Sequence, residues 1–268
     1  MGYRGSVLIL LPPSETKAVP ESGARLELSS LAVPELTAPR RKVMAALANA
    51  SKRRDAPEVL KVSPNLTAQI RANLDLATAA TATSRDIYTG VLFDAARLPV
   101  VLPAGLDILV FSGLWGITRP GDRIPPYRLS GGVNLPGIGP LGRWWNGHLA
   151  ALDSAVTDGE IVIDCRSHSY GAMWSPPAGA LWVEIRVVRE TPSGRSVVTH
   201  HAKYLRGVLT GALARSGGPL PGSVDELCDA AASAGIHVGR LPTGELVHNV
   251  EFEWTTESRG RLTYVLAK

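Results

Sequence analysis

Apolar residues along the chain fall into short runs, and these runs predict the strands of a sheet. The first is Val7–Leu11, an aliphatic segment that ends at Pro12 and Pro13. Ser196–His201 is placed to pair with a longer alternating segment as a hairpin. The other strands that these patterns predict are Asp107–Phe111, Glu160–Cys165, Leu181–Arg189, Glu245–Val250 and Leu262–Leu266.

Between these strands, apolar residues recur at helical spacing, often among alanines. The predicted helices are Arg40–Asn49, Ala68–Ala80, Leu141–Val156, Ala202–Ala214 and Val224–Ala234. Strands and helices mix without strict β-α-β repetition, internal repeats or long linkers. We therefore predict one compact α/β (α+β) domain over residues 1–268, with a mixed β-sheet flanked by helices.

Two polar stretches interrupt this pattern. Thr83–Gly90 reads as a polar loop, and Gly113–Pro140 is a long segment rich in glycine and proline. The second stretch is too long for a plain connection, which predicts a functional role. Its first part, SGLWGITRPGDRIPPYRL, combines Ser, Trp, Arg, Asp and Tyr side chains with stiffening prolines.

Composition narrows the class of protein. Hydrophobic residues make up 45% and charged residues 19%, which is typical of a globular chain. The net charge of +4 is compatible with an anionic partner. Two distant cysteines without a CxxC motif argue against a disulfide framework and fit a reducing cytoplasm. Because no apolar run approaches the length of a membrane span, we expect a cytoplasmic protein. We also expect a monomer.

Several motifs are incomplete. Gly137–Gly142 matches the spacing GxGxxG, but SGGVNLP precedes it instead of a strand, so a turn before a helix competes with a dinucleotide site. The same residues resemble the hairpin of a helix–hairpin–helix DNA module, although only the downstream side is helical in pattern. The GxSxG elbow of a serine hydrolase is missing, and we expect Cys165 to be a buried apolar residue.

The histidines give no metal-binding pattern. His200 and His201 are adjacent and would face opposite sides of a strand, and the other four form no HxxxH or HxH pair. We therefore predict neither a metal nor another cofactor.

Basic and aromatic residues favour a ligand site instead. Five basic residues follow predicted strands, lie in the long loop or begin a helix, which suggests a concave cationic site. They are Arg119, Arg128, Arg166, Lys203 and Arg206. Aromatic residues are interleaved with them, and these either stack on a base or pack in the core. The aromatic residues are Trp115, Tyr127, Trp145 and Tyr170.

Several blocks of sequence, in their order along the chain, resemble the YaaA family, known as peroxide-stress proteins. The resemblance runs from Val7 to about Val250, and no one block carries it alone. The blocks are LLPPSETK, Asp86–Gly90, Ser112–Gly116, Arg119-Pro120, Asp122, Pro126–Leu129, Trp145, IVIDC with Ser167 and Tyr170, Ala202-Lys203, Arg206-Gly207 and Gly244–Val247.

The resemblance implies a compact α/β body with a positively charged cleft that binds DNA, and a role in limiting iron-driven oxidative damage. The arginines and Lys203 would then meet phosphates. The chain departs from the family pattern at three places. His168-Ser169 stands where an acidic pair is expected, and Tyr204 where a second basic residue is expected after Lys203. Glu15 stands where a lysine is expected, and Lys17 is displaced from that position. These departures suggest a specialised paralogue that acts on a small molecule.

Two hypotheses remain open. In the first, the protein binds nucleic acid in a basic cleft and protects cells from peroxide. In the second, it is a metal-free enzyme acting on a nucleobase, nucleotide or similar anionic ring compound, because polar groups at strand ends form small-molecule pockets. Its acid–base candidates are Asp86, Asp122, Tyr170 and Lys203. The candidate ligand-binding residues are Ser14, Thr16, Tyr88, Thr89, Ser112, Trp115, Arg119, Tyr127, Arg128, Trp145, Ser167 and Arg206.

Overall fold

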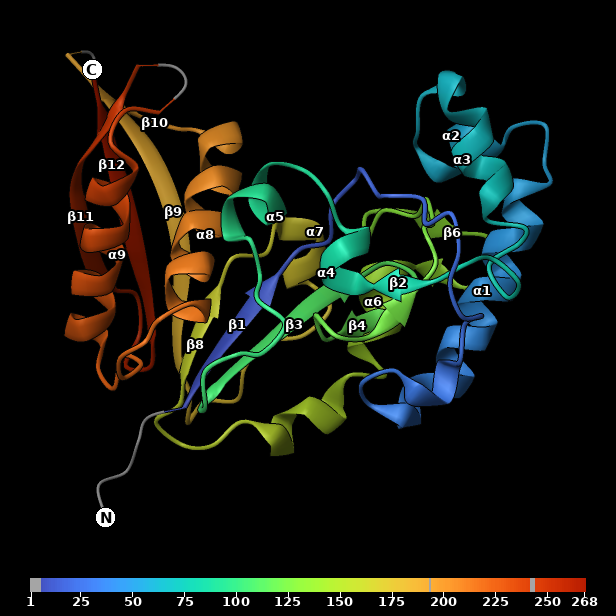
Figure 1. Cartoon of the computed structure of the whole chain (residues 1–268), viewed down its shortest axis with the longest axis horizontal. Helices are drawn as coiled ribbons and strands as arrows, with labels where there is room; N and C mark the ends of the chain where they lie inside the picture. The colour runs from blue at the N-terminus through green and yellow to red at the C-terminus, as the bar shows by residue number, and fades with distance from the viewer. Residues whose placement is uncertain (1–5, 193, 242–243) are drawn as a thin grey trace.

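The structure is a computed structural model, and it describes residues 6–192, 194–241 and 244–268. Its centre is an eight-stranded mixed sheet in the order β11-β12-β9-β8-β1-β3-β4, with β10 paired to β9 (Figure 1). The strands are β1 Val7–Leu11, β3 Leu106–Ser112, β4 Gly116–Thr118, β8 Ile161–Asp164, β9 Leu181–Thr191, β10 Gly194–Val197, β11 Leu246–Trp254 and β12 Arg259–Ala267.

Strand β1 lies in the middle of this sheet and is buried along its whole length. It pairs in parallel with β3 on one side and with β8 on the other, so that Leu10 is level with Leu109 and with Asp164. A strand covered on both faces needs a continuous apolar run, which VLILL supplies. Because the three strands are parallel, their carboxyl ends meet at one edge of the sheet.

Helices cover the sheet and extend beyond it. Figure 1 shows α8 and α9 in front of the strands β9, β11 and β12, and α1, α2 and α3 grouped at the opposite end of the molecule. The helices are α1 Thr37–Ser51, α2 Ala56–Leu60, α3 Thr67–Ala72, α4 Ser84–Ile87, α5 Val91–Ala96, α6 Leu141–Asn146, α7 His168–Gly171, α8 Thr199–Ala214 and α9 Val224–Val238. The predicted α/β class, with a mixed sheet flanked by helices, is confirmed.

Two predicted helices are shorter than the sequence pattern indicates. The segment 68–80 is helical only as α3, because Asn73 turns inward, donates to Arg128 O and Ser51 Oγ, and accepts from Arg128 N. The segment 141–156 is divided after α6, and Ala150–Ala155 forms a 3-10 helix. In both cases side-chain contacts and a local turn outweigh helical propensity.

Two further predictions are wrong in part. His200 and His201 belong to the first turn of α8, and only Gly194–Val197 pairs with β9, so the predicted strand is too long. The predicted loop 83–90 contains the helix α4, which follows the short strand β2 Ala82–Thr83 paired with β5 Arg123–Ile124.

The GxGxxG stretch forms a hairpin outside the main sheet. Its strands are β6 Asn134–Leu135 and β7 Gly139–Pro140, and Gly137 and Gly139 have positive φ angles of 82° and 93°. The motif thus follows neither a strand of the parallel sheet nor a helix, and the interpretation as a turn before a helix holds. None of the helices in the described residues combines the length and apolarity that crossing a bilayer requires.

Glycines allow α8 to lie directly on α5. A Cβ atom at Gly207 would lie 2.2 Å from Leu92 O, and one at Gly211 would lie 2.4 Å from Ala96 O. The backbones of the two helices are therefore closer together than any side chain on α8 would permit at these two positions.

We predict that Gly207→Ala lowers the free energy of unfolding by about 1–3 kcal/mol, because the added methyl group pushes α8 away from α5. Gly217→Ala is the matched control, since nothing lies within 4 Å of a Cβ atom there. Urea unfolding of both variants checks this. An equal loss in the two variants would contradict the close approach of the helices.

Candidate functional site

Three loops gather at the sheet edge where β1, β3 and β8 end. They carry Ser14 to Lys17 after β1, Ser112 at the end of β3, and Ser167 to Tyr170 after β8. The bridge between Lys17 and Tyr88 adds the segment before α5 to the same region. Ligand sites in open α/β sheets lie at such an edge, which makes this region the candidate site.

A chain of buried hydroxyl groups forms the floor of this region. Tyr127 Oη lies 2.6 Å from Ser112 Oγ and 3.0 Å from Tyr88 Oη. Ser112 Oγ also accepts hydrogen bonds from the backbone N–H groups of Leu114 and Trp115. Burial raises the pKa of both Tyr88 and Tyr127, so these phenols stay protonated and can act as hydrogen-bond donors.

Lys17 covers this floor. Its Nζ lies 4.3 Å from the centre of the Tyr127 ring and 5.5 Å from the centre of the Tyr88 ring, and it donates to Ser14 O at 2.7 Å. Burial, reinforced by the nearby charge of Arg128 and opposed by Glu15, lowers the pKa of Lys17 to about 7. A substantial fraction of the amine is therefore neutral at neutral pH.

Arg128 lies near Lys17, and Tyr170 lies near Arg128 and Glu15. The Arg128 guanidinium donates to Glu15 O at 2.9 Å and lies 3.5 Å from the Glu15 carboxylate, which is itself exposed. Tyr170 Oη accepts from Gly131 N, and burial raises the pKa of this phenol. We call this group the lysine–tyrosine site; it consists of Lys17, Tyr88, Ser112, Tyr127, Arg128 and Tyr170.

Small hydroxyl groups form the rim of the lysine–tyrosine site. Ser14 Oγ lies 3.1 Å from Thr16 Oγ1, which donates to Thr89 O at 2.7 Å. A Cβ atom at Gly90 would meet both hydroxyl groups within about 3 Å, and its φ of +114° also favours glycine. Eight of the predicted site residues thus come together here: Ser14, Thr16, Tyr88, Thr89, Ser112, Tyr127, Arg128 and Tyr170.

The predicted tryptophans are core residues. Trp115 and Trp145 are fully buried, and Trp145 Nε1 donates to Gly113 O at 2.9 Å. The Trp115 ring packs edge-on against Tyr127, with 5.7 Å between the ring centres. Of the two roles open for them, stacking on a base and packing in the core, packing fits this burial. Trp115 packs against Tyr127 of the lysine–tyrosine site.

Three predicted polar residues lie apart from the lysine–tyrosine site. Asp122 accepts hydrogen bonds from the backbone N–H groups of Ala32 and Arg119. Arg119 pairs with Asp107 at 2.7 Å, and exposed Asp86 accepts from Thr83 Oγ1. Asp122 and Asp86 therefore each have a partner three residues away in the chain, and Arg119 has a partner near the start of β3.

The remaining basic residues have different environments. Arg166 is buried and forms a bidentate pair with Asp164, while it also donates to Trp174 O. Arg206 donates to Ile185 O on β9 at 2.7 Å, and Lys203 is exposed on α8. Ser167 is exposed and precedes α7. The predicted group of cations is therefore spread over the molecule, and most of its members are held by internal partners.

Two cations, Lys17 and Arg40, are held by several contacts in the structure but were not predicted as site residues from the sequence. Lys17 was judged displaced from a family position, although its place just after a buried strand was the available signal. Arg40 is fully buried in α1, where its guanidinium donates to the carbonyl groups of Trp115, Ile117, Ala32 and Val33. Its helical sequence context gave no sign of that role.

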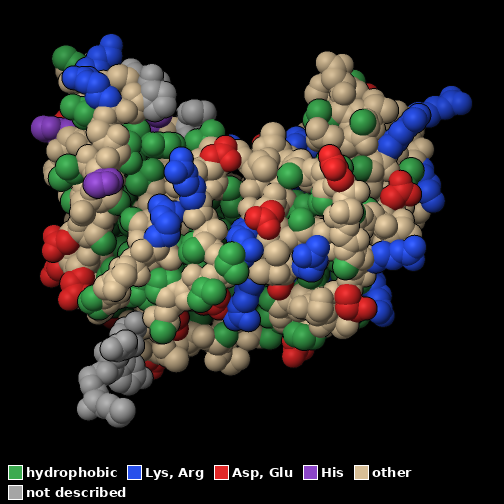
Figure 2. Space-filling model, in the orientation of Figure 1, with side chains coloured by type: hydrophobic (Ala, Val, Ile, Leu, Met, Phe, Trp, Pro, Cys, Tyr) green, Lys and Arg blue, Asp and Glu red, His purple; other side chains and the backbone are tan. Residues whose placement is uncertain are grey.

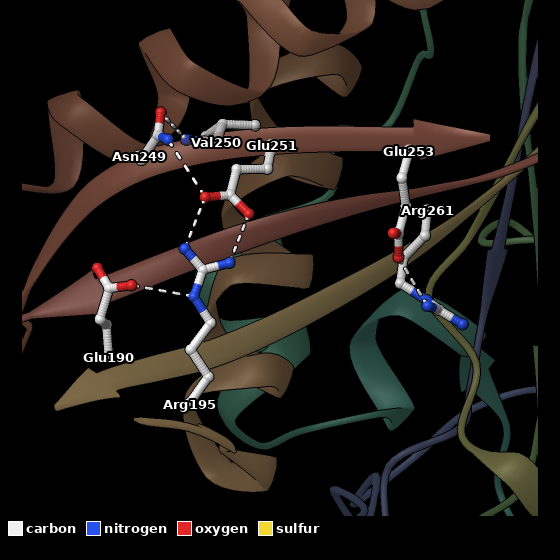
Figure 3. Close-up of polar contacts among 7 residues, drawn as sticks. All are labelled: Glu190, Arg195, Asn249, Val250, Glu251, Glu253 and Arg261. Carbon is white, nitrogen blue, oxygen red and sulfur yellow. Dashed lines mark hydrogen bonds and ion pairs between the residues drawn. The ribbon is translucent and has the colours of Figure 1, made fainter. Parts of the chain in front are cut away.

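Two other surface features are distinct from the lysine–tyrosine site. A groove of about 1140 Å³ runs between α5, α8 and α9, with mainly apolar walls such as Val208, Leu220 and Val238. On β9 to β12, Arg195 bridges Glu190 and Glu251 while Arg261 pairs with Glu253 (Figure 3). Exposed ion pairs of this kind contribute little to stability.

No group of three or more His, Cys, Asp or Glu side chains suited to a metal ion occurs within 6–192, 194–241 and 244–268.

Comparison with known proteins shows the family of the chain. A family model described as peroxide stress protein YaaA matches residues 7–230, which include β1, β3, β8 and every residue of the lysine–tyrosine site. The chain belongs to this YaaA family.

Relatives of this YaaA-family chain cover most of its length. A UPF0246 protein of Streptomyces coelicolor is 40% identical over 242 residues, which are 87% of this chain and 92% of that protein. A UPF0246 protein of Corynebacterium efficiens is 38% identical, over 90% of this chain and 100% of its own. A more distant UPF0246 protein, from Francisella tularensis subsp. novicida, is 26% identical over 57% of this chain and 66% of its own.

We predict that Tyr127→Phe lowers the free energy of unfolding by about 1–3 kcal/mol, because Ser112 Oγ and Tyr88 Oη lose a buried hydrogen-bond partner. Tyr264→Phe is the matched control, since Tyr264 Oη is buried without a hydrogen-bond partner in the described part of the chain. Removal of the Tyr264 hydroxyl group should leave the free energy of unfolding unchanged or raise it. Urea denaturation measures both variants, and a Tyr127→Phe protein as stable as the wild type would contradict the hydroxyl chain.

Proposed function

We propose that this YaaA-family protein binds a small anionic ring compound at the lysine–tyrosine site and transforms it by acid–base chemistry, in a cell's response to peroxide. The observation that supports this most strongly is Lys17, whose amine lies on the face of Tyr127 next to Arg128. A base that is half neutral near pH 7 is well matched to proton transfer at that pH.

Each residue of the lysine–tyrosine site has a role in this proposal. Arg128 binds the anionic group of the ligand by displacing the exposed carboxylate of Glu15, since a guanidinium recognises carboxylates and phosphates in the same way. Tyr170 donates a hydrogen bond or a proton, and Lys17 accepts a proton. Of the four acid–base candidates from the sequence, Tyr170 is the one that lies in this site, so Asp86, Asp122 and Lys203 have no role in the proposal.

We predict a saturable thermal shift with at least one compound in a panel of nucleobases, nucleoside monophosphates and aromatic carboxylates. Arg128→Gln should weaken binding of that compound by about tenfold or more, because a hydrogen bond to a charged group is lost. Arg25→Gln, which removes an exposed arginine, is the control and should bind like the wild type. A panel without any stabilising compound, or equal losses in the two variants, would count against the proposal.

A second candidate function is nucleic-acid binding, which the charge of the α1–α3 region favours. Residues 41–71 contain seven exposed basic residues and two acidic ones. Figure 2 shows Lys and Arg side chains gathered at the right of the molecule, where α1 to α3 lie, whereas the hollow beside them carries both signs of charge. The seven residues are Arg41, Lys42, Lys52, Arg53, Arg54, Lys61 and Arg71, and they are called the basic helical segment.

This candidate predicts that a labelled duplex of about 20 base pairs binds with an affinity that falls steeply with salt. The double variant Arg41→Gln/Lys42→Gln should reduce the slope of log affinity against log salt by about 2, because two phosphate contacts are lost. Fluorescence anisotropy measures the slope, and Arg119→Gln/Lys203→Gln is the matched variant away from the segment. Binding that depends on the second pair instead would place the interface in the cleft expected from the sequence.

A further inference from the structure

The environment of Lys17 suits a nucleophilic amine as well as a base. Its Nζ has a single hydrogen-bond acceptor in the described structure, Ser14 O, and two aromatic rings cover its other side. The charged and titratable groups around it are Arg128 and Glu15 at the rim and the phenols of Tyr88 and Tyr127, with Tyr170 next to Arg128 and Glu15. Lysines become nucleophilic when they are desolvated or placed next to another cation, and both conditions hold here.

The other nucleophiles in the described chain are less well placed. Cys165 is fully buried, and burial raises the pKa of its thiol to about 12. Burial, together with Asp225 and Asp229, also raises the pKa of Cys228. Lys52, Lys61 and Lys203 are exposed, and therefore lack the cover that favours a neutral amine, and Lys42 is exposed although its Nζ lies 6.0 Å from the centre of the Trp144 ring.

We propose that Lys17 forms an imine with a carbonyl compound that carries a carboxylate or phosphate group. This inference rests on the proposed function, because it uses the same lysine–tyrosine site and the same anion contact at Arg128. It goes further by adding a covalent step and by narrowing the ligand to an anionic aldehyde or ketone.

The step balances without any additional reagent. The lone pair of the neutral Lys17 amine attacks the carbonyl carbon, a C–N bond forms, and the carbonyl π electrons move to oxygen. A proton passes from nitrogen to this oxygen, and the carbinolamine then loses water to leave a C=N bond. The neighbouring phenols remain protonated and can donate hydrogen bonds to the oxygen as it departs.

The geometry also provides for the anionic part of the ligand. Arg128 is held on the same side as Lys17 by its hydrogen bond to Glu15 O, and its ion pair with the exposed Glu15 carboxylate is long, at 3.5 Å. An incoming carboxylate or phosphate can replace that side chain without removing the backbone contact. The hydroxyl groups of Ser14 and Thr16 lie at the rim, where they can bond further oxygen atoms.

The test uses pyridoxal 5′-phosphate, an aldehyde with a phosphate group, followed by reduction of any imine with sodium borohydride and peptide mapping by mass spectrometry. At pH 7, Lys17 should react at least about tenfold faster than the exposed lysines, because a far larger fraction of its amine is neutral. The other five lysines of the chain act as internal controls. Lys17→Met, which replaces the amine by an uncharged unbranched side chain, should lose the fast adduct while it keeps the thermal stability of the wild type.

A second reagent separates this inference from the proposed function. Formaldehyde with cyanoborohydride reports the reactivity of Lys17 without an anionic group, and inorganic phosphate should slow only the reaction with pyridoxal phosphate. If Lys17 reacts no faster than the exposed lysines with either reagent, the imine is overturned, while ligand binding through Arg128 is still decided by the thermal shifts. Selective reaction with formaldehyde alone would support the nucleophile and overturn the anion contact on which the proposed function rests.

Discussion

The parallel pairing of β1 with β3 and β8 is the constraint on which the candidate site depends. All five residues of β1 are buried, and both neighbours run in its direction, so three chain segments end at one edge of the sheet. The loop that carries Lys17, the hydroxyl of Ser112 and the turn that leads to Tyr170 are brought together by this pairing. The fourth contributor, the segment with Tyr88, is tied to the first by the bridge between Lys17 and Tyr88.

Partners decide which of the many arginines are available to a ligand. Arg40 is enclosed by backbone carbonyl groups, Arg166 is buried with Asp164, and Arg119 pairs with Asp107. Burial alone would raise the pKa of Asp164, but Arg166 lowers it below its usual value, as expected of a paired internal carboxylate. The ion pair of Arg128 with the exposed Glu15 carboxylate is longer, at 3.5 Å, than the pairs of Arg119 and Arg166, at 2.7 and 2.8 Å. A basic sequence therefore does not by itself indicate a basic cleft.

The sequence predicted the strands better than the site. Runs such as VLILL and IVIDC leave few alternatives, because a strand buried on both faces must be apolar throughout. Polar residues were expected at and after the ends of such strands: Ser112 is the last residue of β3, and Tyr170 lies in α7, which follows β8. The helix 68–80 and the strand at His200-His201 were wrong in part, since the inward turn of Asn73 and the start of α8 depend on tertiary contacts that no local pattern records.

Lys17 was missed for a related reason. Its importance comes from the Tyr127 ring, which is far away in sequence, and from the neighbouring charge of Arg128. Local sequence shows only a lysine in a polar loop. For Trp115 and Trp145 the sequence left two roles open, stacking on a ligand and packing in the core, and both rings are fully buried in the core.

The most direct test of this account is the pKa of Lys17 in the folded protein. NMR titration of the side-chain Cε and Nζ resonances, assigned by comparison with Lys17→Arg, gives that value for the free protein. One lysine is expected to titrate at about 7, and its resonances should be absent from the spectrum of Lys17→Arg. If no lysine titrates near 7, Lys17 is charged at neutral pH and the lysine–tyrosine site loses its base.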